Sequence, residues 1–359
     1  MLAGQGIDFT FVFGQPSHSE RDRGDEGSLR WGLRTKNLYL SPGGMMFYQQ
    51  LPGHYYRGAD LIILPHENKF LLTTLFLRRN MPSSRIAFFG HGLNFQSSSA
   101  MSPGNLLKRQ TALKTDWWFA YTEKTRDILA SWGMPEDRIT IIDNSIDTRV
   151  LVRWGAEVSA DELDALRTSL GIEGASVGLF LGSLYHDKRL DFLFSCADRL
   201  RNLFPDFSFL IIGDGPLRER VRSFCSTRNW AVWAGVLKGR EKVLHLMLGR
   251  VMLNPGLVGL NILDSFALGL PMVTTDCTIH SPEIAYLRPG ENGLLTANRE
   301  DAFVQGVAAI LEDSVLADKL GAGCRADAKR YTIENMAENF CKGILKALRA
   351  ERLRLGHWA

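Results

Sequence analysis

The sequence lacks a long hydrophobic run. Its longest apolar stretches are Leu61–Leu64 and the interrupted run Phe70–Leu77, whereas a helix that spans a bilayer needs about 20 apolar residues. It also lacks the basic segment and apolar stretch with which a secretory signal peptide begins. We therefore expect a cytoplasmic protein that at most touches the inner face of the cell membrane.

Paired cysteines and a strong net charge are also missing. The five cysteines include no C-x-x-C pair, which argues against a zinc site and a disulfide framework. Because 42 lysines and arginines nearly balance 39 aspartates and glutamates, the composition does not indicate a nucleic-acid partner. The small surplus of positive charge lies in residues 1–150, which hold 17 basic and 14 acidic side chains.

Short apolar runs recur along the chain, bounded by Gly, Pro or Asp and separated by helix-length segments. This alternation predicts parallel sheets that are covered on both faces. The series breaks after Asn144 and restarts after Gly174, so we expect an N-terminal Rossmann-like domain (1–150), a linker (151–174), a second Rossmann-like domain (175–335) and an amphipathic C-terminal helix (336–359). The predicted strands are 8–14, 61–65, 85–90, 117–122, 139–143, 177–182, 207–213, 230–235, 251–255 and 271–276.

The first eight residues resemble the end of a helix, because Gly6 is the kind of residue that ends one. An α/β chain usually opens with a strand. We therefore expect that the first strand of the N-terminal domain is missing from this chain.

Ligands of open parallel sheets bind at the carboxyl ends of the strands, so the loops there are candidate sites. In the loop Gly182–Lys188 a glycine allows a sharp turn, and the lysine can reach an anion, although such a lysine can also simply face solvent. The loop Gly213–Pro216 is either a second contact or a plain turn. It is not G-x-G-x-x-G, since Arg218 occupies the third glycine position, which disfavours a nicotinamide dinucleotide. The candidates here are Gly182, Ser183, Lys188, Asp214 and Gly215.

The loop and helix between Asn254 and Pro271 are the most informative. Glycines follow a strand, and a helix then begins whose first amides would point at an anion. Asp264 lies about one turn into that helix, where a carboxylate can accept hydrogen bonds from sugar hydroxyls. The layout suits two phosphates and a ribose. The candidates here are Gly256, Gly259, Leu260, Asn261 and Asp264.

His91 stands between two glycines at the end of the predicted strand 85–90. A lone histidine is more often structural than catalytic, but this setting favours an exposed, catalytic side chain. Weaker candidates for the same kind of cleft are Asn94, His280 and Glu283.

On these residues the second half resembles the nucleotide-sugar-binding domain of the retaining, group 1 type glycosyltransferases of family 4. Gly182…Lys188, Gly213–Pro216, Pro255–Pro271 and Pro282-Glu283…Asn292-Gly293-Leu-Leu295 keep the family's order and spacing. Gly90-His91-Gly92, Tyr121-Thr122-Glu123 and Asn144-Ser145-Ile146-Asp147 of the first half are consistent with it. The resemblance implies the GT-B fold, in which two Rossmann-like domains face a central cleft.

The resemblance also implies an activity. A sugar would pass from a nucleotide diphosphate donor to an acceptor hydroxyl with retention of configuration, without a metal ion or other cofactor. Lys188 would hold the diphosphate with amides near Gly259–Asn261, Asp264 would hold the ribose in place of the second Glu of an E-x7-E motif, and His91 would contact the donor sugar.

We expect the acceptor to be a glycan or a lipid-linked glycan, in the synthesis of lipopolysaccharide, another surface polysaccharide or glycolipid. The apolar run Phe70–Leu77 is followed by Arg78 and Arg79. Together with the basic first half, it predicts a peripheral contact with an anionic membrane.

Two departures from the family leave alternatives open. Gly256 stands where the first Glu of E-x7-E is expected, and Ser183 stands where the family has an Arg. These differences favour a non-catalytic nucleotide-sugar-binding protein or a truncated, inactive homologue. A nucleotide-sugar 2-epimerase shares the architecture, but it should show more carboxylates and histidines in the cleft.

Overall fold

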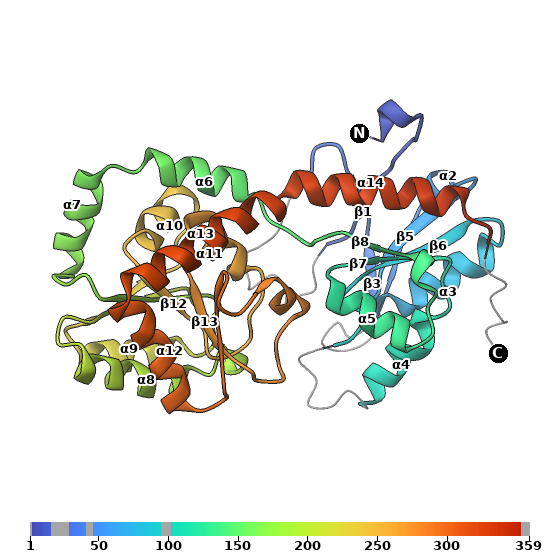
Figure 1. The fold of residues 1–359 in the computed structure, drawn as a ribbon. Coiled ribbons are helices and arrows are strands. Elements are labelled where there is room, and N and C mark those ends of the chain that lie inside the picture. Colours follow the sequence, from blue (N-terminus) through green and yellow to red (C-terminus); the bar gives the residue numbers. More distant parts are fainter. Residues whose placement is uncertain (1, 16–28, 41–45, 95–101, 353–359) are drawn as a thin grey trace. The chain divides into compact units, whose positions relative to one another are not determined.

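The computed structural model describes residues 2–15, 29–40, 46–94 and 102–352 (Figure 1). The chain divides into two compact units. Unit 1 consists of Met1–Asp143 and Met336–Ala359, and unit 2 consists of Asn144–Asn335. Each unit has its own parallel sheet, as the alternation of strands and helices predicts.

Unit 2 contains a six-stranded sheet in the order β11-β10-β9-β12-β13-β14, and all its pairs are parallel. From β9 the chain runs outward to β10 and β11, and then returns to the other side of β9 to form β12. The direction of winding therefore changes between β9 and β12, where doubly wound sheets bind their ligands. The strands are β9 (Val177–Leu181), β10 (Ser208–Ile212), β11 (Ala231–Gly235), β12 (Val251–Leu253), β13 (Met272–Thr275) and β14 (Gly293–Thr296).

The strands of unit 2 are apolar because both faces of the sheet are covered. On β9, Phe180 packs into one buried cluster, while Leu179 and Leu181 pack into a second cluster on the opposite face. Helices α8, α9 and α12 contribute to the first cluster, and α10, α11 and α13 contribute to the second. Their bounds are α8 (Leu190–Leu203), α9 (Arg218–Ser226), α10 (Gly239–Leu246), α11 (Asn261–Leu268), α12 (Glu300–Glu312) and α13 (Ser314–Arg330).

The predicted linker 151–174 instead folds as part of unit 2. It overlaps α6 (Thr148–Glu157) and contains α7 (Ala160–Leu170). Leu151 of α6 is buried against Val243 and Ala267, so α6 packs on α10 and α11. The charge alternation of this segment marks the solvent face of two packed helices.

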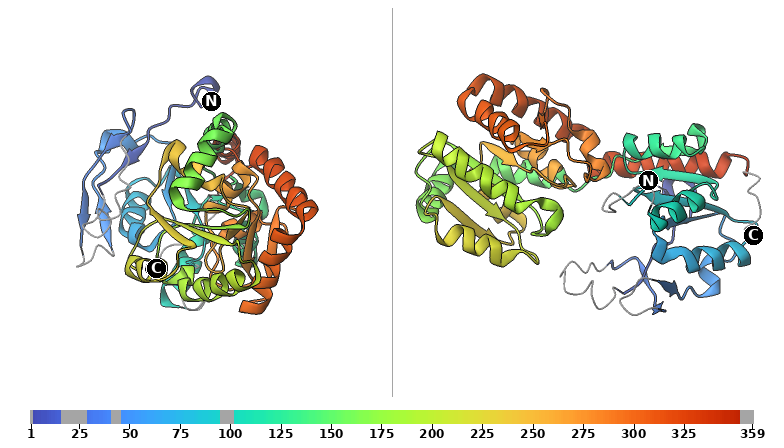
Figure 2. Two further views of the ribbon diagram at one scale, coloured as in Figure 1. Left: turned by 90° about the vertical axis from the view of Figure 1, so that its left-hand side faces the viewer. Right: turned by 90° about the horizontal axis from the view of Figure 1, so that it is seen from below.

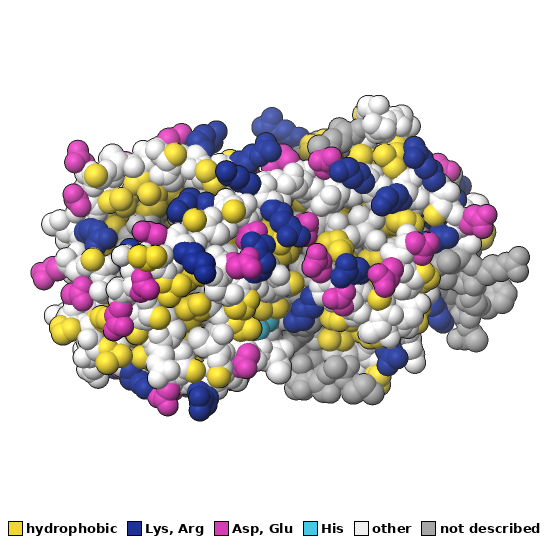
Figure 3. All heavy atoms as spheres, viewed as in Figure 1, with side chains coloured by type: hydrophobic (Ala, Val, Ile, Leu, Met, Phe, Trp, Pro, Cys, Tyr) yellow, Lys and Arg dark blue, Asp and Glu magenta, His cyan; other side chains and the backbone are white. Residues whose placement is uncertain are grey.

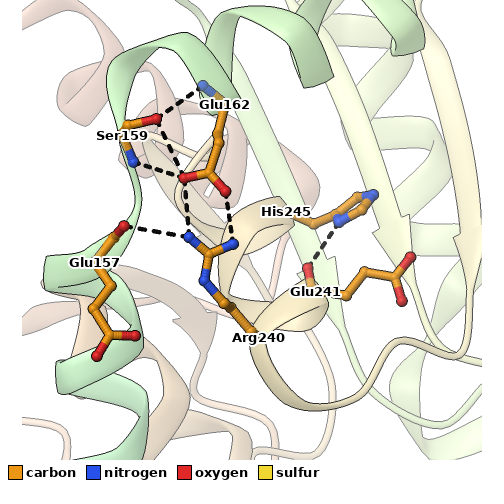
Figure 4. Close-up of polar contacts among 6 residues, drawn as sticks. All are labelled: Glu157, Ser159, Glu162, Arg240, Glu241 and His245. Atoms are coloured by element: carbon orange, nitrogen blue, oxygen red, sulfur yellow. Dashed lines mark hydrogen bonds and ion pairs between the residues drawn. The ribbon is translucent and has the colours of Figure 1, made fainter.

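An arginine of α10 holds the beginning of α7 in place (Figure 4). Ser159 and Glu162 form a capping box at the first turn of α7. Arg240 donates to both carboxylate oxygens of Glu162 at 2.7 and 2.9 Å and to the carbonyl of Glu157 at 3.2 Å. Two neighbouring helices are thereby joined at the surface of unit 2.

In its described residues, unit 1 contains a four-stranded parallel sheet, β5-β6-β7-β8, and two small two-stranded sheets. The predicted strand 8–14 is wrong as a member of the main sheet, because only Val12–Phe13 is strand and it pairs with Leu33–Arg34. Figure 2 shows these blue segments as a layer of their own. The strands are β1 (Val12–Phe13), β2 (Leu33–Arg34), β3 (Asn37–Tyr39), β4 (Phe47–Gln49), β5 (Leu61–Pro65), β6 (Arg85–Gly90), β7 (Trp117–Ala120) and β8 (Ile139–Ile141).

The helices of unit 1 flank this sheet. Gly6 ends the first helical turn in the left-handed conformation, with φ 70°, as its position predicts. The helical elements are η1 (Ala3–Gln5), α2 (Gly53–Tyr56), η2 (Asn68–Phe70), α3 (Leu71–Asn80), α4 (Pro103–Ala112), α5 (Glu123–Ser131) and η3 (Glu136–Arg138).

The predicted C-terminal helix is α14 (Ile333–Arg349), and residues 353–359 lie outside the described part of the chain. Its apolar face is buried on the sheet of unit 1. Ile344 and Ala347 are buried there, and the ring of Phe340 stacks on Phe119 with the centroids 4.3 Å apart. The apolar side of this helix is therefore part of the core of unit 1.

Gly343 allows α14 to lie close to the sheet. A Cβ atom at this position would lie 2.5 Å from Phe119 Cε1 and 2.7 Å from Thr140 Oγ1. Gly343→Ala would favour an isolated helix by about 1 kcal/mol, but crowding of a packed core costs about 1–3 kcal/mol. We expect a net loss in the free energy of unfolding of unit 1, measured by chemical denaturation.

The matched control is Lys342→Ala, since Lys342 is the exposed neighbour and its ion pair with Glu338 lies at the surface. Its effect should be small. Gly343→Ala as stable as the parent chain would contradict the packing described for α14.

Candidate functional site

Two of the predicted loops meet at the point where the winding of unit 2 changes direction. The amide of Leu257 donates to the carbonyl of Asp187 at 2.9 Å, and the ammonium of Lys188 donates to the carbonyl of Leu257 at 2.6 Å. The side-chain amide of Asn261 donates to the carbonyl of Leu181 at 3.0 Å. The loops after β9 and β12 therefore form one surface at the carboxyl edge of the sheet.

Gly256 makes this meeting possible by having no side chain. A Cβ atom there would lie 2.2 Å from the carbonyl oxygen of Asp187 and 2.7 Å from the carbonyl carbon of Lys188. Contacts that short with backbone atoms exclude any larger residue. Gly256, which is predicted to bind the donor, thus lets the backbones of the two loops approach each other closely. The same position has no room for the glutamate of E-x7-E.

Lys188 follows β9 in a short helical turn, η4 (His186–Lys188), and only 5% of its surface is exposed. Burial lowers the pKa of its ammonium to about 8, and Asp187 opposes part of that change. A buried cation with a depressed pKa gains from a nearby anion. This is the electrostatic setting expected of a lysine that binds phosphate.

The loop after β10 touches the loop after β9. A Cβ atom on Gly213, whose φ is 137°, would lie 1.9 Å from the carbonyl oxygen of Gly182, and one on Gly215 would lie 2.6 Å from that of Leu184. Both glycines are therefore required for this contact. The carboxylate of Asp214 accepts from the amide of Gly215 at 2.7 Å and pairs with Arg218, while Ser183 is exposed.

Asp264 is 6% exposed and forms an ion pair with Lys242, whose ammonium lies 2.5 Å from its Oδ1. Burial raises the pKa of the Asp264 carboxyl, and Lys242 opposes the rise. No spacing in the sequence predicts Lys242, because it reaches Asp264 across the contact between α10 and α11. The carboxylate predicted to hold a ribose is thus already neutralised on one oxygen.

The beginning of α11 is organised by its own residues. The amide of Gly259 donates to Oδ1 of Asn261 at 3.1 Å. Since the other side-chain group of Asn261 bonds to Leu181, this residue joins the end of β9 to the first turn of α11. Leu260, the residue before that turn, is half-buried. The first turn of α11 is therefore joined to Leu181, the neighbour of Gly182, where a Cβ atom would lie 3.6 Å from the ammonium nitrogen of Lys188.

His280 and Glu283 are braces of the loop after β13 rather than exposed groups. His280 is 4% exposed; its Nδ1 accepts from the amide of Val258 at 3.1 Å, and its Nε2 donates to the carbonyl of Thr275 at 2.7 Å. Glu283 is 2% exposed and accepts from the side chain of Asn144 at 2.8 Å. His280 thus holds the backbone of the loops after β12 and β13, and Glu283 is held by the side chain of Asn144.

The candidates of unit 1 lie at the carboxyl edge of its own sheet. His91 follows β6, is half-buried, and packs edge-on against the ring of Tyr121, with the centroids 4.5 Å apart. The backbone of Asn94 exchanges two hydrogen bonds with the side chain of Asn105. The side chain of Asn105 therefore holds the backbone of Asn94.

His66 follows β5 at the same edge and is not marked by any motif in the sequence. Its Nε2 lies 2.9 Å from Oγ1 of Thr111, and its ring packs against Phe88 and Trp118. Burial, with a smaller contribution from the charge of Lys108, lowers its pKa to about 3. His66 is consequently neutral at pH 7 and packs as part of the core of unit 1.

Within the residues that the structure describes, no three His, Cys, Asp or Glu side chains come together in a way that would hold a metal ion. The groups that face the carboxyl edge of unit 2 are a lysine, backbone amides and paired carboxylates.

Lys242→Met tests the ion pair between Lys242 of α10 and Asp264 of α11. Without the ammonium, the pKa of Asp264 should rise further, because burial is then unopposed. A carboxyl whose pKa is raised in the folded state destabilises the protein as pH rises through the interval between its unfolded and folded values. We expect a loss of about 3 kcal/mol in the free energy of unfolding at pH 7, and a smaller loss near pH 4.5.

Chemical denaturation at the two pH values measures this difference. The double variant Lys242→Met/Asp264→Asn should recover much of the stability, since neither charge then remains buried. An equal loss at both pH values would show that Asp264 does not carry the effect.

Two family models match the chain, one on each predicted domain. The model described as "Glycosyltransferase Family 4" matches residues 1–150, and the one described as "Glycosyl transferases group 1" matches residues 175–313. No curated protein sequence matches the chain. Together the two models cover most of it.

Solved structures share the fold at low sequence identity. Anabaena Alr3699/HepE in complex with UDP is 16% identical, with a TM-score of 0.67, over 81% of this chain and 80% of that one. A glycosyltransferase from Rickettsia africae is 13% identical, with a TM-score of 0.68, over 95% and 91%. The lipopolysaccharide outer core galactosyltransferase WaaB is 17% identical, with a TM-score of 0.59, over 81% and 77%. This chain belongs to the group 1, family 4 glycosyltransferases and has their GT-B fold of two α/β domains.

Proposed function

We propose that this glycosyltransferase moves a sugar from a nucleoside diphosphate donor to an acceptor hydroxyl with retention of configuration. The observation that carries the proposal is the surface of unit 2 where Lys188 and the beginning of α11 meet. A buried ammonium beside helix amides suits a diphosphate. We propose a uridine nucleotide as the first donor to test, because HepE is in complex with UDP.

The chemistry follows from where charge develops. As the bond between sugar and diphosphate breaks, negative charge grows on the departing phosphate oxygens. Lys188 and the dipole of α11 would stabilise that charge more strongly than the charge of the bound donor, which lowers the barrier. The acceptor hydroxyl would pass its proton to the departing phosphate, and His91 of unit 1 would contact the donor sugar.

The donor site of this chain differs from the family pattern at Gly256. Because the backbone of Asp187 and Lys188 occupies the space beside it, no carboxylate can stand there. We propose that Asp264, with one oxygen on Lys242, holds the ribose through its other oxygen. Without a glutamate at position 256, groups other than this carboxylate would have to recognise the donor sugar.

We propose a glycan acceptor, in surface polysaccharide or glycolipid synthesis; a related fold occurs in the lipopolysaccharide galactosyltransferase WaaB. The peripheral membrane contact predicted at Phe70–Leu77 stays a prediction: Leu77 is fully buried and Arg78 donates to the carbonyl of Lys114, while Arg79 is exposed. Among the described helices none is long and apolar enough to cross a membrane. On the face drawn in Figure 3, basic and acidic side chains are intermixed.

A second function, nucleotide-sugar binding without catalysis, is favoured by the same loop. Gly256 leaves no room for a glutamate, and Ser183 supplies no second cation. Turnover separates the two functions, because a transferase should hydrolyse its donor slowly even without acceptor, whereas a binding protein should release it intact.

Lys188→Met tests the role of the buried ammonium. We expect UDP affinity to fall about 10- to 100-fold, as for the loss of a charged hydrogen bond worth about 1.5–3 kcal/mol, and donor turnover to be lost. Isothermal titration with UDP and release of free sugar from UDP-sugars measure the two effects. The matched control is Lys319→Met, since Lys319 is an exposed lysine on α13. Parent-like UDP affinity in Lys188→Met would refute this donor site.

The pKa of Lys188 predicts how donor affinity depends on pH. With a pKa of about 8, the ammonium of the free protein is mostly protonated at pH 7 and mostly neutral at pH 9. UDP affinity should therefore fall about tenfold between these values, with uptake of a proton on binding near pH 8.5. Lys188→Arg, which stays charged, should flatten the profile. Equal UDP affinity of the parent chain at pH 7 and pH 9 would contradict this assignment.

A further inference from the structure

We propose that Arg189 is a positioning residue, which clamps the loop after β12 against Lys188 and ties it to the loops after β13 and β14. The inference rests on the proposed function, because that loop is the one assigned to the donor. It concerns a different residue and a different role, since Arg189 acts on the loops and not on the nucleotide.

The backbone of Arg189 adopts a conformation that arginine rarely takes. Its φ is 55° and its ψ is 49°, in the left-handed region. Among the described residues, only Asp143 shares a positive φ without being glycine. A side chain with a Cβ atom is strained there and persists where its surroundings hold it, which often happens at functional sites.

The side chain of Arg189 supplies that hold. Its Nη1 lies 2.9 Å from the carbonyl oxygen of Pro255, 3.2 Å from Oγ1 of Thr275 and 2.6 Å from Oδ1 of Asn298. These acceptors stand at the carboxyl ends of β12, β13 and β14, which are neighbours in the sheet. The guanidinium also lies over the ring of Phe192 at 4.2 Å. One donor group thus joins three adjacent strand ends.

The left-handed turn directs two consecutive side chains to the two ends of one short segment. Lys188 donates to the carbonyl of Leu257, and Arg189 donates to the carbonyl of Pro255. Gly256 lies between these two carbonyls and packs directly on the backbone of Lys188. The segment Pro255–Leu257 is therefore clamped from both ends, which fixes where the ammonium stands.

The clamp extends to the next loop through Thr275. Its hydroxyl donates to the carbonyl of Pro255 at 2.8 Å, and its own carbonyl accepts from His280. His280 in turn accepts from the amide of Val258. If Arg189 is removed, we expect the whole segment from Pro255 to Val258 to become more mobile, although Lys188 itself is unchanged.

Two substitutions separate the guanidinium from the backbone strain. Arg189→Gly removes the side chain and suits the left-handed conformation, whereas Arg189→Ala removes the side chain and keeps the strain. Amide hydrogen exchange of residues 254–258, 274–280 and 296–298 without nucleotide is the first readout. UDP affinity and the separate kcat and KM of donor hydrolysis are the second.

We expect both variants to exchange these amides at least tenfold faster and to bind UDP about tenfold more weakly. KM for the donor should rise more than kcat falls, because the ammonium is still present. The matched control is Arg228→Gly, since Arg228 also lies over an aromatic ring, that of Phe224, and bonds to Asp198, but precedes β11 at the other end of the sheet. It should leave both readouts unchanged.

The outcomes distinguish the two proposals. If the parent chain does not bind UDP, the proposed function fails, while the exchange measurement still decides whether Arg189 braces the loops. Parent-like exchange and UDP affinity in both variants would overturn the clamp. Equal losses in Arg228→Gly would also overturn it, because the effect would then belong to the general stability of unit 2.

Discussion

The candidate donor site depends on one close contact, in which the backbone of Gly256 lies against the backbone of Asp187 and Lys188. This contact joins the loops of β9 and β12, the two strands between which the winding of the sheet reverses. It allows Lys188 to donate to Leu257 and Arg189 to donate to Pro255. Because a Cβ atom at position 256 would clash with this backbone, the close contact of the two loops requires glycine there.

The sheet beneath the site provides the rigidity that this arrangement needs. Strands β9, β10, β12 and β13 are buried along their whole length, so their ends are fixed by packing on both faces. Lys188 and Asp264 are both buried near that edge, and their charges are compensated differently. Asp264 has Lys242 beside it, whereas the ammonium of Lys188 donates to the carbonyl of Leu257 and keeps a lowered pKa. A bound diphosphate would place negative charge beside the ammonium of Lys188.

The sequence predicts the main sheets well because their strands are continuous apolar runs, and it predicts the turns after β9, β10 and β12 because glycines mark them. It fails at residues 8–14, where Phe9 and Phe11 remain 44% and 38% exposed and the strand pairs outside the main sheet. Lys242 is missed because helix packing brings it to Asp264. The role proposed for Arg189 is missed because the residues next to it in the sequence do not predict a left-handed backbone conformation. Contacts set by tertiary packing leave no periodic signal in the chain.

A crystal structure of the full chain grown with UDP would show whether the edge between β9 and β12 binds a nucleoside diphosphate. We expect phosphate oxygens within hydrogen-bond distance of Lys188 Nζ, beside the first turn of α11, with Gly256 still packed on Asp187. UDP bound elsewhere on the chain, with the ammonium of Lys188 still buried on the carbonyl of Leu257 alone, would contradict this expectation.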